Sequence, residues 1–206
     1  MAIIVVQKVL SIMNKPLVVC ALKNEFSSKS TLFNILYTGV GKVNAAISLT
    51  DYILNINKPT FIINYGTAGS QKENVGSLID CTKFIQRDMD ASGLGFEIYE
   101  TPLEPLIPKI IDFSYFKENP LKTYSICATG DNFLENKEGT HVGDVVDMEA
   151  YALAKVCYKF KIPFISYKYI SDGADENAAE NWTNNVKKGN ELFKSKILSF
   201  YNLNEN

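Results

Sequence analysis

Short apolar runs of strand length alternate with segments of helical periodicity along most of this chain. Apolar runs bounded by Gly, Pro or polar residues predict strands at residues 16–22, 32–40, 60–65, 77–87, 122–128 and 163–170. Apolar residues at helical spacing predict helices at residues 42–56, 149–160 and 179–201. Residues 88–120 are rich in Gly and Pro, and we expect loop with a little helix there. This alternation predicts a three-layer α/β fold.

No feature of the sequence marks a boundary between domains. The chain has 206 residues, a length that suits one hydrophobic core. We therefore expect residues 1–206 to form a single domain, with residues 1–15 as a possible N-terminal extension of unassigned role. In the last predicted helix, the residues expected to face inward are Trp182, Val186, Leu192, Phe193, Ile197 and Leu198.

The charge balance argues against nucleic acid or an anionic membrane surface as a partner. The formal net charge is −2, and Arg87 is the only arginine among 21 basic residues. A protein that binds several phosphates usually has more of the bidentate arginine side chains. No stretch approaches the ~20 apolar residues of a transmembrane helix, and the N-terminus lacks the features of a leader peptide. These observations predict a cytoplasmic protein.

The cysteine and histidine content argues against a metal centre. His141 is the only histidine, and no CxxC or Cys/His cluster occurs. A zinc site and a Cys–His or Ser–His nucleophile pair are therefore disfavoured, and we expect no metal and no cofactor. Buried, reduced cysteines are expected at all four positions. They are Cys20, Cys81, Cys127 and Cys157.

Three acidic residues stand where ligands gather in α/β proteins, at strand ends and helix starts. Glu25 comes shortly after the first predicted strand, Glu149 opens a predicted helix, and Asp172 follows the last strand. Glycine-rich turns at residues 39–42 and 66–69 lie at similar positions. Each acid alone is more simply explained as a helix cap. Together they suit a sugar-binding hydrolytic site.

Four segments carry a resemblance to the nucleoside phosphorylase/nucleosidase superfamily. They are GVGKVNAA (39–46), NYGTAG (64–69), VDMEAYALA (146–154) and ISDGAD (170–175). Their order and spacing fit over roughly residues 16–200, and the most similar branch is that of the 5'-methylthioadenosine/S-adenosylhomocysteine nucleosidases. The resemblance implies an α/β/α phosphorylase/hydrolase-like fold with a central mixed, partly barrel-like sheet. It also implies release of adenine from a purine nucleoside, as in methionine salvage, by a homodimer or other homo-oligomer.

The resemblance assigns roles to particular residues. Asp172 matches the acid that protonates the purine at N7, and Ser171 would orient it. Glu149 matches the carboxylate that holds the ribose hydroxyls. Glu25 falls where the nucleosidases keep the carboxylate that activates water, and Lys168 stands in place of an arginine that helps to hold this water. The other substrate-binding residues implied are Ala21, Val40, Thr67, Ala68, Gly69, Phe133, Leu134, Asp147, Met148 and Ala174.

The chemistry requires these residue types independently of the resemblance. A purine leaves slowly as an anion, and a general acid that protonates it contributes roughly 10²–10⁴ in rate. A carboxylic acid keeps its proton near neutral pH only where burial or a negative neighbour raises its pKa. Bond breaking leaves positive charge on the sugar, which a carboxylate stabilises, and a second carboxylate directs water to the anomeric carbon from the opposite side.

A phosphate-dependent phosphorylase is the main alternative. Phosphorylases of this superfamily surround phosphate with a glycine-rich loop after the first strand and with several arginines. Here that loop is Lys23-Asn24-Glu25-Phe26, which has no glycine and contains an acid that would repel phosphate. Water is therefore the favoured nucleophile, and a non-catalytic nucleoside-binding protein is disfavoured by the presence of all three acids.

Two segments leave the substrate open. Arg87 replaces a histidine that the nucleosidases usually carry, so it is either a solvated or ion-paired residue or a sign of an acidic substrate group, as in a futalosine-type nucleoside. The aromatic residues 113–116 are candidates to cover the 5' end of the substrate or to meet a second subunit.

Overall fold

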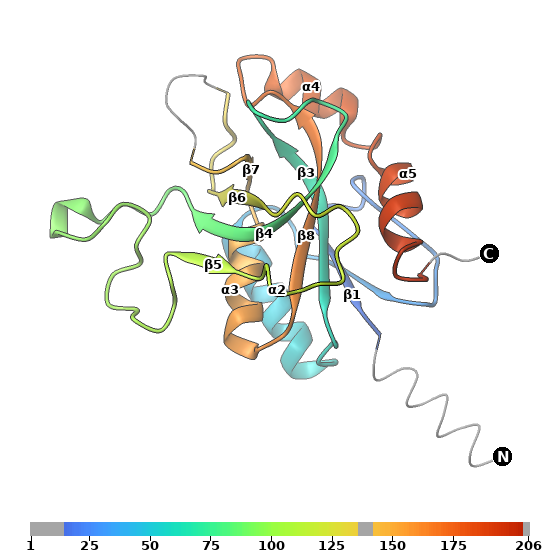
Figure 1. The fold of residues 1–206 in the computed structure, drawn as a ribbon, viewed down its shortest axis with the longest axis horizontal. Helices are drawn as coiled ribbons and strands as arrows, with labels where there is room; N and C mark the ends of the chain where they lie inside the picture. The colour runs from blue at the N-terminus through green and yellow to red at the C-terminus, as the bar shows by residue number, and fades with distance from the viewer. Residues whose placement is uncertain (1–14, 136–141, 204–206) are drawn as a thin grey trace, which may run out of the picture.

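A computed structural model describes residues 15–135 and 142–203 of the chain (Figure 1). Residues 1–14 of the expected N-terminal extension, together with His141, lie outside the described residues.

Five strands pair in a closed ring. β3 pairs with β7 and β8, β6 pairs with β7 and β4, and β4 completes the ring by pairing with β8. Both parallel and antiparallel pairs occur, which confirms the expected mixed, partly barrel-like sheet (Figure 1). The ring strands are β3 (Ile62–Gly69), β4 (Leu78–Gln86), β6 (Ser125–Thr129), β7 (Val145–Asp147) and β8 (Phe164–Asp172).

Three further strands extend the ring at its two sides. β1 adds in parallel to β3, β2 adds in parallel to β1, and β5 adds in antiparallel fashion to β4. Their bounds are β1 (Leu17–Cys20), β2 (Asn34–Tyr37) and β5 (Ile110–Asp112).

Helices cover the sheet on both faces. Alternate residues of β1 show the division: Leu17 and Val19 pack in the core under α2 and α3, whereas Val18 and Cys20 pack with the C-terminal helices. This confirms the expected three-layer arrangement (Figure 1). The helices are α2 (Lys42–Asn55), α3 (Ala150–Phe160), the 3-10 turn η1 (Ser92–Leu94), α4 (Ala178–Asn185), α5 (Asn190–Leu192) and the π-helical η2 (Phe193–Leu198).

The expected continuous helix at residues 179–201 is wrong. α4 ends at Asn185, and a turn at residues 186–189 separates it from α5 and η2. Gly189 lies in this turn, and a Cβ there would lie 2.4 Å from the Tyr65 hydroxyl and 2.5 Å from Cγ of Tyr169. The chain passes so close to these two rings that only glycine fits.

Two strands run further than predicted. Residues 66–69 were expected to form a glycine turn, but β3 continues through Gly69 because β8 pairs with it along its whole length. In the same way β8 continues through Asp172. The short strands β5 and β7 were not predicted, since three residues carry too little periodicity.

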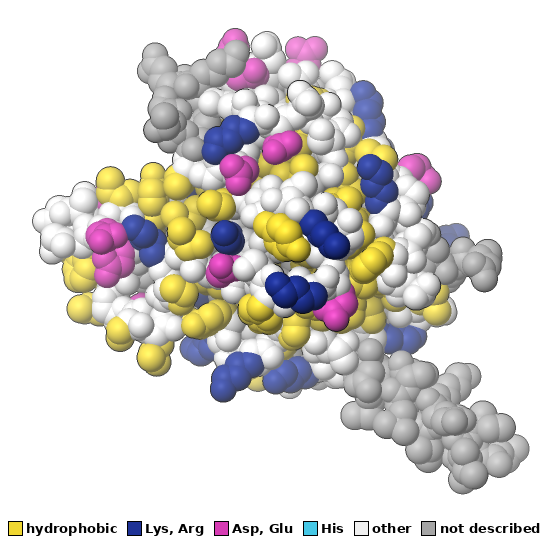
Figure 2. Space-filling model, viewed as in Figure 1, with side chains coloured by type: hydrophobic (Ala, Val, Ile, Leu, Met, Phe, Trp, Pro, Cys, Tyr) yellow, Lys and Arg dark blue, Asp and Glu magenta, His cyan; other side chains and the backbone are white. Residues whose placement is uncertain are grey.

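The segment between β4 and β5 forms an arm at the left of Figure 1. Figure 2 shows apolar side chains gathered on it, and the most exposed are Leu94, Leu103 and Leu106.

The aromatic residues of segment 113–116 differ from one another in their exposure. Phe113 is buried against Phe84 and Phe164, and Tyr115 is exposed.

The four cysteines are free and buried, as expected. Burial raises the pKa of Cys20, Cys127 and Cys157 well above the ordinary thiol value.

Within the described ranges, no helix is both long and apolar enough to cross a membrane. In the same ranges, no group of three or more His, Cys, Asp or Glu residues is arranged to hold a metal ion.

Candidate active site

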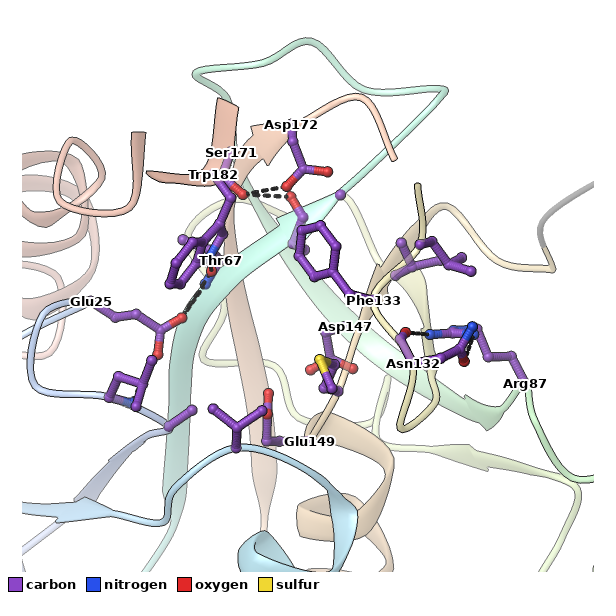
Figure 3. A pocket seen from close by; sticks show the side chains of 18 residues that line it. Glu25, Thr67, Arg87, Asn132, Phe133, Asp147, Glu149, Ser171, Asp172 and Trp182 are labelled. Carbon is purple, nitrogen blue, oxygen red and sulfur yellow. Dashed lines mark hydrogen bonds between the residues drawn. The ribbon is translucent and has the colours of Figure 1, made fainter. Parts of the chain in front are cut away.

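One pocket collects all but two of the predicted site residues (Figure 3). They come from the ends of β1, β3, β7 and β8 and from the loops after β2 and β6. The predicted residues that line the pocket are Ala21, Glu25, Val40, Thr67, Ala68, Gly69, Phe133, Leu134, Asp147, Met148, Glu149, Ser171 and Asp172. Lys168 and Ala174 are absent from its wall.

Glu25 is buried, with three hydrogen bonds to its carboxylate. Oε1 accepts from the Thr67 N–H at 3.0 Å and from the Thr67 hydroxyl at 2.9 Å, and Oε2 accepts from the Leu22 N–H at 3.1 Å. Its relative exposure is 5%. Glu25 therefore has a fixed orientation beside the carboxyl ends of β1 and β3, and it caps no helix.

Glu149 is partly buried and stands at the start of α3, but its side chain does not cap that helix. Its Oε1 accepts the backbone N–H of Gly41 at 2.9 Å, so the glycine turn before α2 meets the start of α3. Burial first and the charge of Asp147 second raise the pKa of Glu149 to about 8. The raised pKa favours the protonated carboxyl near neutral pH.

Asp147 caps α3 instead and pairs with Lys168. Its carboxylate accepts the Ala150 N–H at 2.9 Å and lies 2.8 Å from the Lys168 ammonium. Burial opposes both charges, but Lys168 holds the pKa of Asp147 below its usual value, and Asp147 raises that of Lys168. Lys168, predicted to help hold the water, is absent from the pocket lining, and its ammonium forms an ion pair with Asp147.

Lys168 nevertheless approaches Glu25. A Cβ at Gly66 would lie 3.3 Å from Glu25 Oε1 and 3.5 Å from Lys168 Nζ. The ammonium and the Glu25 carboxylate therefore lie on the same side of the Gly66 backbone.

Ala174 is the other predicted site residue that does not line the pocket. It packs in a cluster with Val146 instead.

Asp172 occupies another side of the pocket at the end of β8 (Figure 3). Its carboxylate accepts the Ser171 hydroxyl at 2.7 Å and the Ala174 N–H at 3.0 Å. Burial raises the pKa of Asp172, and these hydrogen bonds oppose the shift only in part. Gly69 gives the carboxylate its space, because a Cβ there would lie 2.6 Å from Asp172 Oδ1.

Arg87 lines the pocket but is used within the protein. One guanidinium nitrogen donates to the Asn132 side chain at 2.7 Å, and the other donates to the carbonyls of Asn132 and Gly130. A Cβ at Gly130 would lie 2.7 Å from the guanidinium carbon. The arginine therefore holds the loop that carries Phe133, and Figure 3 shows it at the side of the pocket.

Trp182 is a pocket residue that the sequence pattern misplaced. We expected it to face the core, but it lines the pocket and donates its indole N–H to the Thr67 hydroxyl at 2.9 Å. Val186, Phe193, Ile197 and Leu198 are buried as expected.

Three further residues line the pocket and were not predicted: Leu22, Asn132 and Val146. Each adjoins a predicted site residue in the sequence, and this was the available signal for them.

The chain is similar to known proteins over most of its length. The model of the phosphorylase superfamily matches residues 29–200. The chain is 32% identical to the 5'-methylthioadenosine/S-adenosylhomocysteine nucleosidase of Haemophilus ducreyi over 163 residues, which cover 71% of this chain and 70% of the relative. It is 34% identical to the nucleosidase of Staphylococcus aureus strain MRSA252 over 161 residues, 70% of each chain.

Solved structures share the fold at lower identity. A Helicobacter pylori 5'-methylthioadenosine/S-adenosylhomocysteine nucleosidase in complex with an inhibitor has a TM-score of 0.77 at 21% identity, covering 92% of this chain and 98% of that one. The futalosine hydrolase of the same species has a TM-score of 0.78 at 20% identity, covering 93% and 98%.

Proposed function

The chain belongs to the phosphorylase superfamily, and we propose that it hydrolyses the N-glycosidic bond of a purine nucleoside such as 5'-methylthioadenosine or S-adenosylhomocysteine. The observation that carries this proposal is the placement of Glu25, Glu149 and Asp172 around one pocket. Relatives at 32–34% identity are named for this activity.

Asp172 is the proposed general acid. Its raised pKa favours a proton on the carboxyl group closer to neutral pH, and the carboxyl is buried beside the pocket. When the bond between the sugar and the purine breaks, its electron pair moves into the ring, and the proton of Asp172 goes to N7. The purine then leaves as a neutral molecule. Phe133 and Leu134 are proposed to flank the base.

Glu149 is the proposed ribose ligand. Its carboxyl accepts the Gly41 N–H and, among the described residues, no other donor, so it keeps acceptor positions for the sugar hydroxyls. Binding of these hydroxyl donors would favour the ionised form, which stabilises positive charge as it develops on the sugar. Met148, next to it on the pocket wall, is proposed to lie beneath the ribose.

Glu25 is the proposed base that activates water. The oxygen of water forms a bond to the anomeric carbon as the purine leaves, and the proton it releases goes to the Glu25 carboxylate. The products are free purine and free sugar, so no phosphate is consumed. Substitution from the face opposite the purine inverts the anomeric carbon.

Water is favoured over phosphate by the charges around the pocket. Among the described lining residues the one cationic side chain is Arg87, which donates to Asn132 and Gly130. Lys168 is paired with Asp147 behind the wall. Glu25 occupies the end of the pocket near β1, where its charge repels an anion. The same bonds of Arg87 support a role in the loop instead of binding an acidic substrate group.

A homodimer or other homo-oligomer is part of the proposal. Apolar side chains are exposed on the β4–β5 arm and along α2, and exposed apolar patches commonly mark contacts between proteins. They include Val43, Ile47, Leu54, Leu94, Leu103 and Leu106. Sedimentation at micromolar concentration should give at least twice the 23.0 kDa chain mass.

We also propose that the protein acts in the cytoplasm, in a salvage route that recovers methionine. Four free, buried cysteines are typical of a reducing compartment. Cell fractionation tests the location, and growth of a deletion strain on methylthioadenosine as sulfur source tests the route.

A panel of purine nucleosides tests the reaction. Each nucleoside is incubated with and without phosphate, and release of free base is followed. We expect release from 5'-thio-substituted adenosines at the same rate in both buffers. Release that requires phosphate would identify a phosphorylase, and preference for a nucleoside with a 5' carboxylate would move the substrate to the futalosine type.

A further inference from the structure

Trp182 is the chain's only tryptophan and lies on α4, away from the sequence segments that carry the three acids. Its ring forms part of the pocket wall beside Thr67 (Figure 3). The indole N–H lies 2.9 Å from the Thr67 hydroxyl oxygen, and that hydroxyl lies 2.9 Å from Glu25 Oε1. The three side chains form one connected chain of hydrogen bonds.

The chemistry of the groups fixes the direction of this chain. An indole N–H only donates, so the Thr67 oxygen must accept from it. A hydroxyl has one hydrogen, and the acceptor nearest to it is the Glu25 carboxylate. Trp182 thus favours the rotamer of the hydroxyl that points at Glu25.

Counting acceptor positions on Glu25 shows the consequence. A carboxylate accepts about four hydrogen bonds, two at each oxygen. Oε1 is filled by the N–H and the hydroxyl of Thr67, and Oε2 takes one bond from the Leu22 N–H. With the donors that the described residues supply, one acceptor position remains, and it belongs to Oε2.

We propose that Trp182 is a positioning residue for the hydrolytic reaction. It acts through Thr67 to occupy Oε1 of Glu25, so that water binds at Oε2 alone and in a single orientation. This inference rests on the proposed function. Without the indole N–H, the Thr67 hydroxyl is free to turn away from Glu25. An acceptor position then opens at Oε1, and part of the water binds there in an orientation that does not lead to attack on the sugar.

A double-mutant cycle between Trp182 and Thr67 tests the inference. Trp182→Phe keeps an aromatic ring and removes the N–H, and we expect kcat to fall about five- to tenfold with KM changed less than twofold. Thr67→Val removes the hydroxyl and should lower kcat further. If Trp182 acts through Thr67, then adding Trp182→Phe to Thr67→Val causes no further loss. The control Tyr158→Phe removes a hydroxyl from an exposed ring on α3 and should leave both constants unchanged.

A spectroscopic signature separates positioning from a purely structural role. A single tryptophan gives a single indole N–H resonance in a ¹⁵N-correlated NMR spectrum. Thr67→Val should shift this resonance upfield, toward the value of an indole without an acceptor, while the melting temperature changes little. An unmoved resonance would overturn the inference even where Trp182→Phe fails to fold.

The remaining outcomes are also decisive. Equal losses from Trp182→Phe in the wild-type and Thr67→Val backgrounds would overturn the inference and make Trp182 a wall of the pocket only. A rise in KM with unchanged kcat would do the same. Wild-type protein that releases no base from any nucleoside would overturn the proposed function itself.

Discussion

Asp80 and Asp172 are both buried aspartates in strands of the same ring, and they differ in the donors around them. The Asp80 carboxylate, fully buried on β4, accepts hydrogen bonds from Asn119, from the N–H and the hydroxyl of Thr123, and from the Tyr124 N–H. Within the described part of the chain, the Asp172 carboxylate accepts from Ser171 and Ala174 alone, and it borders the pocket.

The difference separates a structural carboxylate from the proposed general acid. Four donors fill the acceptor positions of the Asp80 carboxylate and fix residues 119–124 to β4, which leaves no lone pair for a ligand. With two donors, burial prevails at Asp172 and its pKa is raised. Equal burial of the same residue type thus serves opposite purposes, and the number of donors decides which.

The largest expected effect is on catalysis at Asp172. Asp172→Asn keeps the hydrogen bond from Ala174 but has no proton to give, so kcat should fall about 10²–10⁴-fold. The free energy of unfolding should change by less than ~1 kcal/mol. Base release and urea unfolding measure the two quantities, and Asp112→Asn, at an exposed position, is the control. Turnover within tenfold of wild type would remove Asp172 from the mechanism.

Asp80→Asn should show the reverse pattern. The substitution places an amide N–H₂ against backbone donors, and we expect a loss of about 2–4 kcal/mol in the free energy of unfolding. Below the new melting temperature kcat should stay within twofold of wild type. A kinetic defect in folded Asp80→Asn protein would contradict the assignment of Asp80 as structural.

Glu149 should give a pH dependence of stability. Its pKa is about 8 in the folded chain against an ordinary 4.5. Between these values the folded state binds the proton more tightly, so stability must fall as pH rises through this window. From pH 6 to pH 8 wild type should lose about 2 kcal/mol relative to Glu149→Gln. Unfolding curves at both pH values test this, and parallel losses in the two proteins would count against the shift.

Arg87→Lys should have the smallest of these effects. Lysine keeps the charge but cannot donate in a fork to Asn132 and Gly130. The loop that carries Phe133 should loosen, with KM about fivefold higher for neutral and acidic nucleosides alike. A loss confined to nucleosides with an acidic 5' group would show that Arg87 binds the substrate.

The sequence predicted the layers and most of the pocket, because both depend on local patterns. Apolar periodicity located β1, α2, α3 and β8, and the short motifs placed Glu149 at a helix start and Asp172 at a strand end. Local patterns could not predict that five strands close into a ring. Closure depends on long-range pairs such as Gly69 with Val146 and on the double pairing of β8.

The misplaced residues have the same physical explanation. Trp182 shares a helical period with Val186 and Phe193, and a period shows which residues share a face but not whether that face meets the core or a cavity. Lys168 points to a partner, Asp147, that the sequence separates from it by 21 positions, and no local pattern specifies that ion pair.

The central claim is that water, directed by Glu25, is the nucleophile. A single turnover in H₂¹⁸O with phosphate present tests it most directly. We predict that the released sugar carries one ¹⁸O at the anomeric carbon and that no sugar 1-phosphate forms. Formation of sugar 1-phosphate without ¹⁸O would contradict the account.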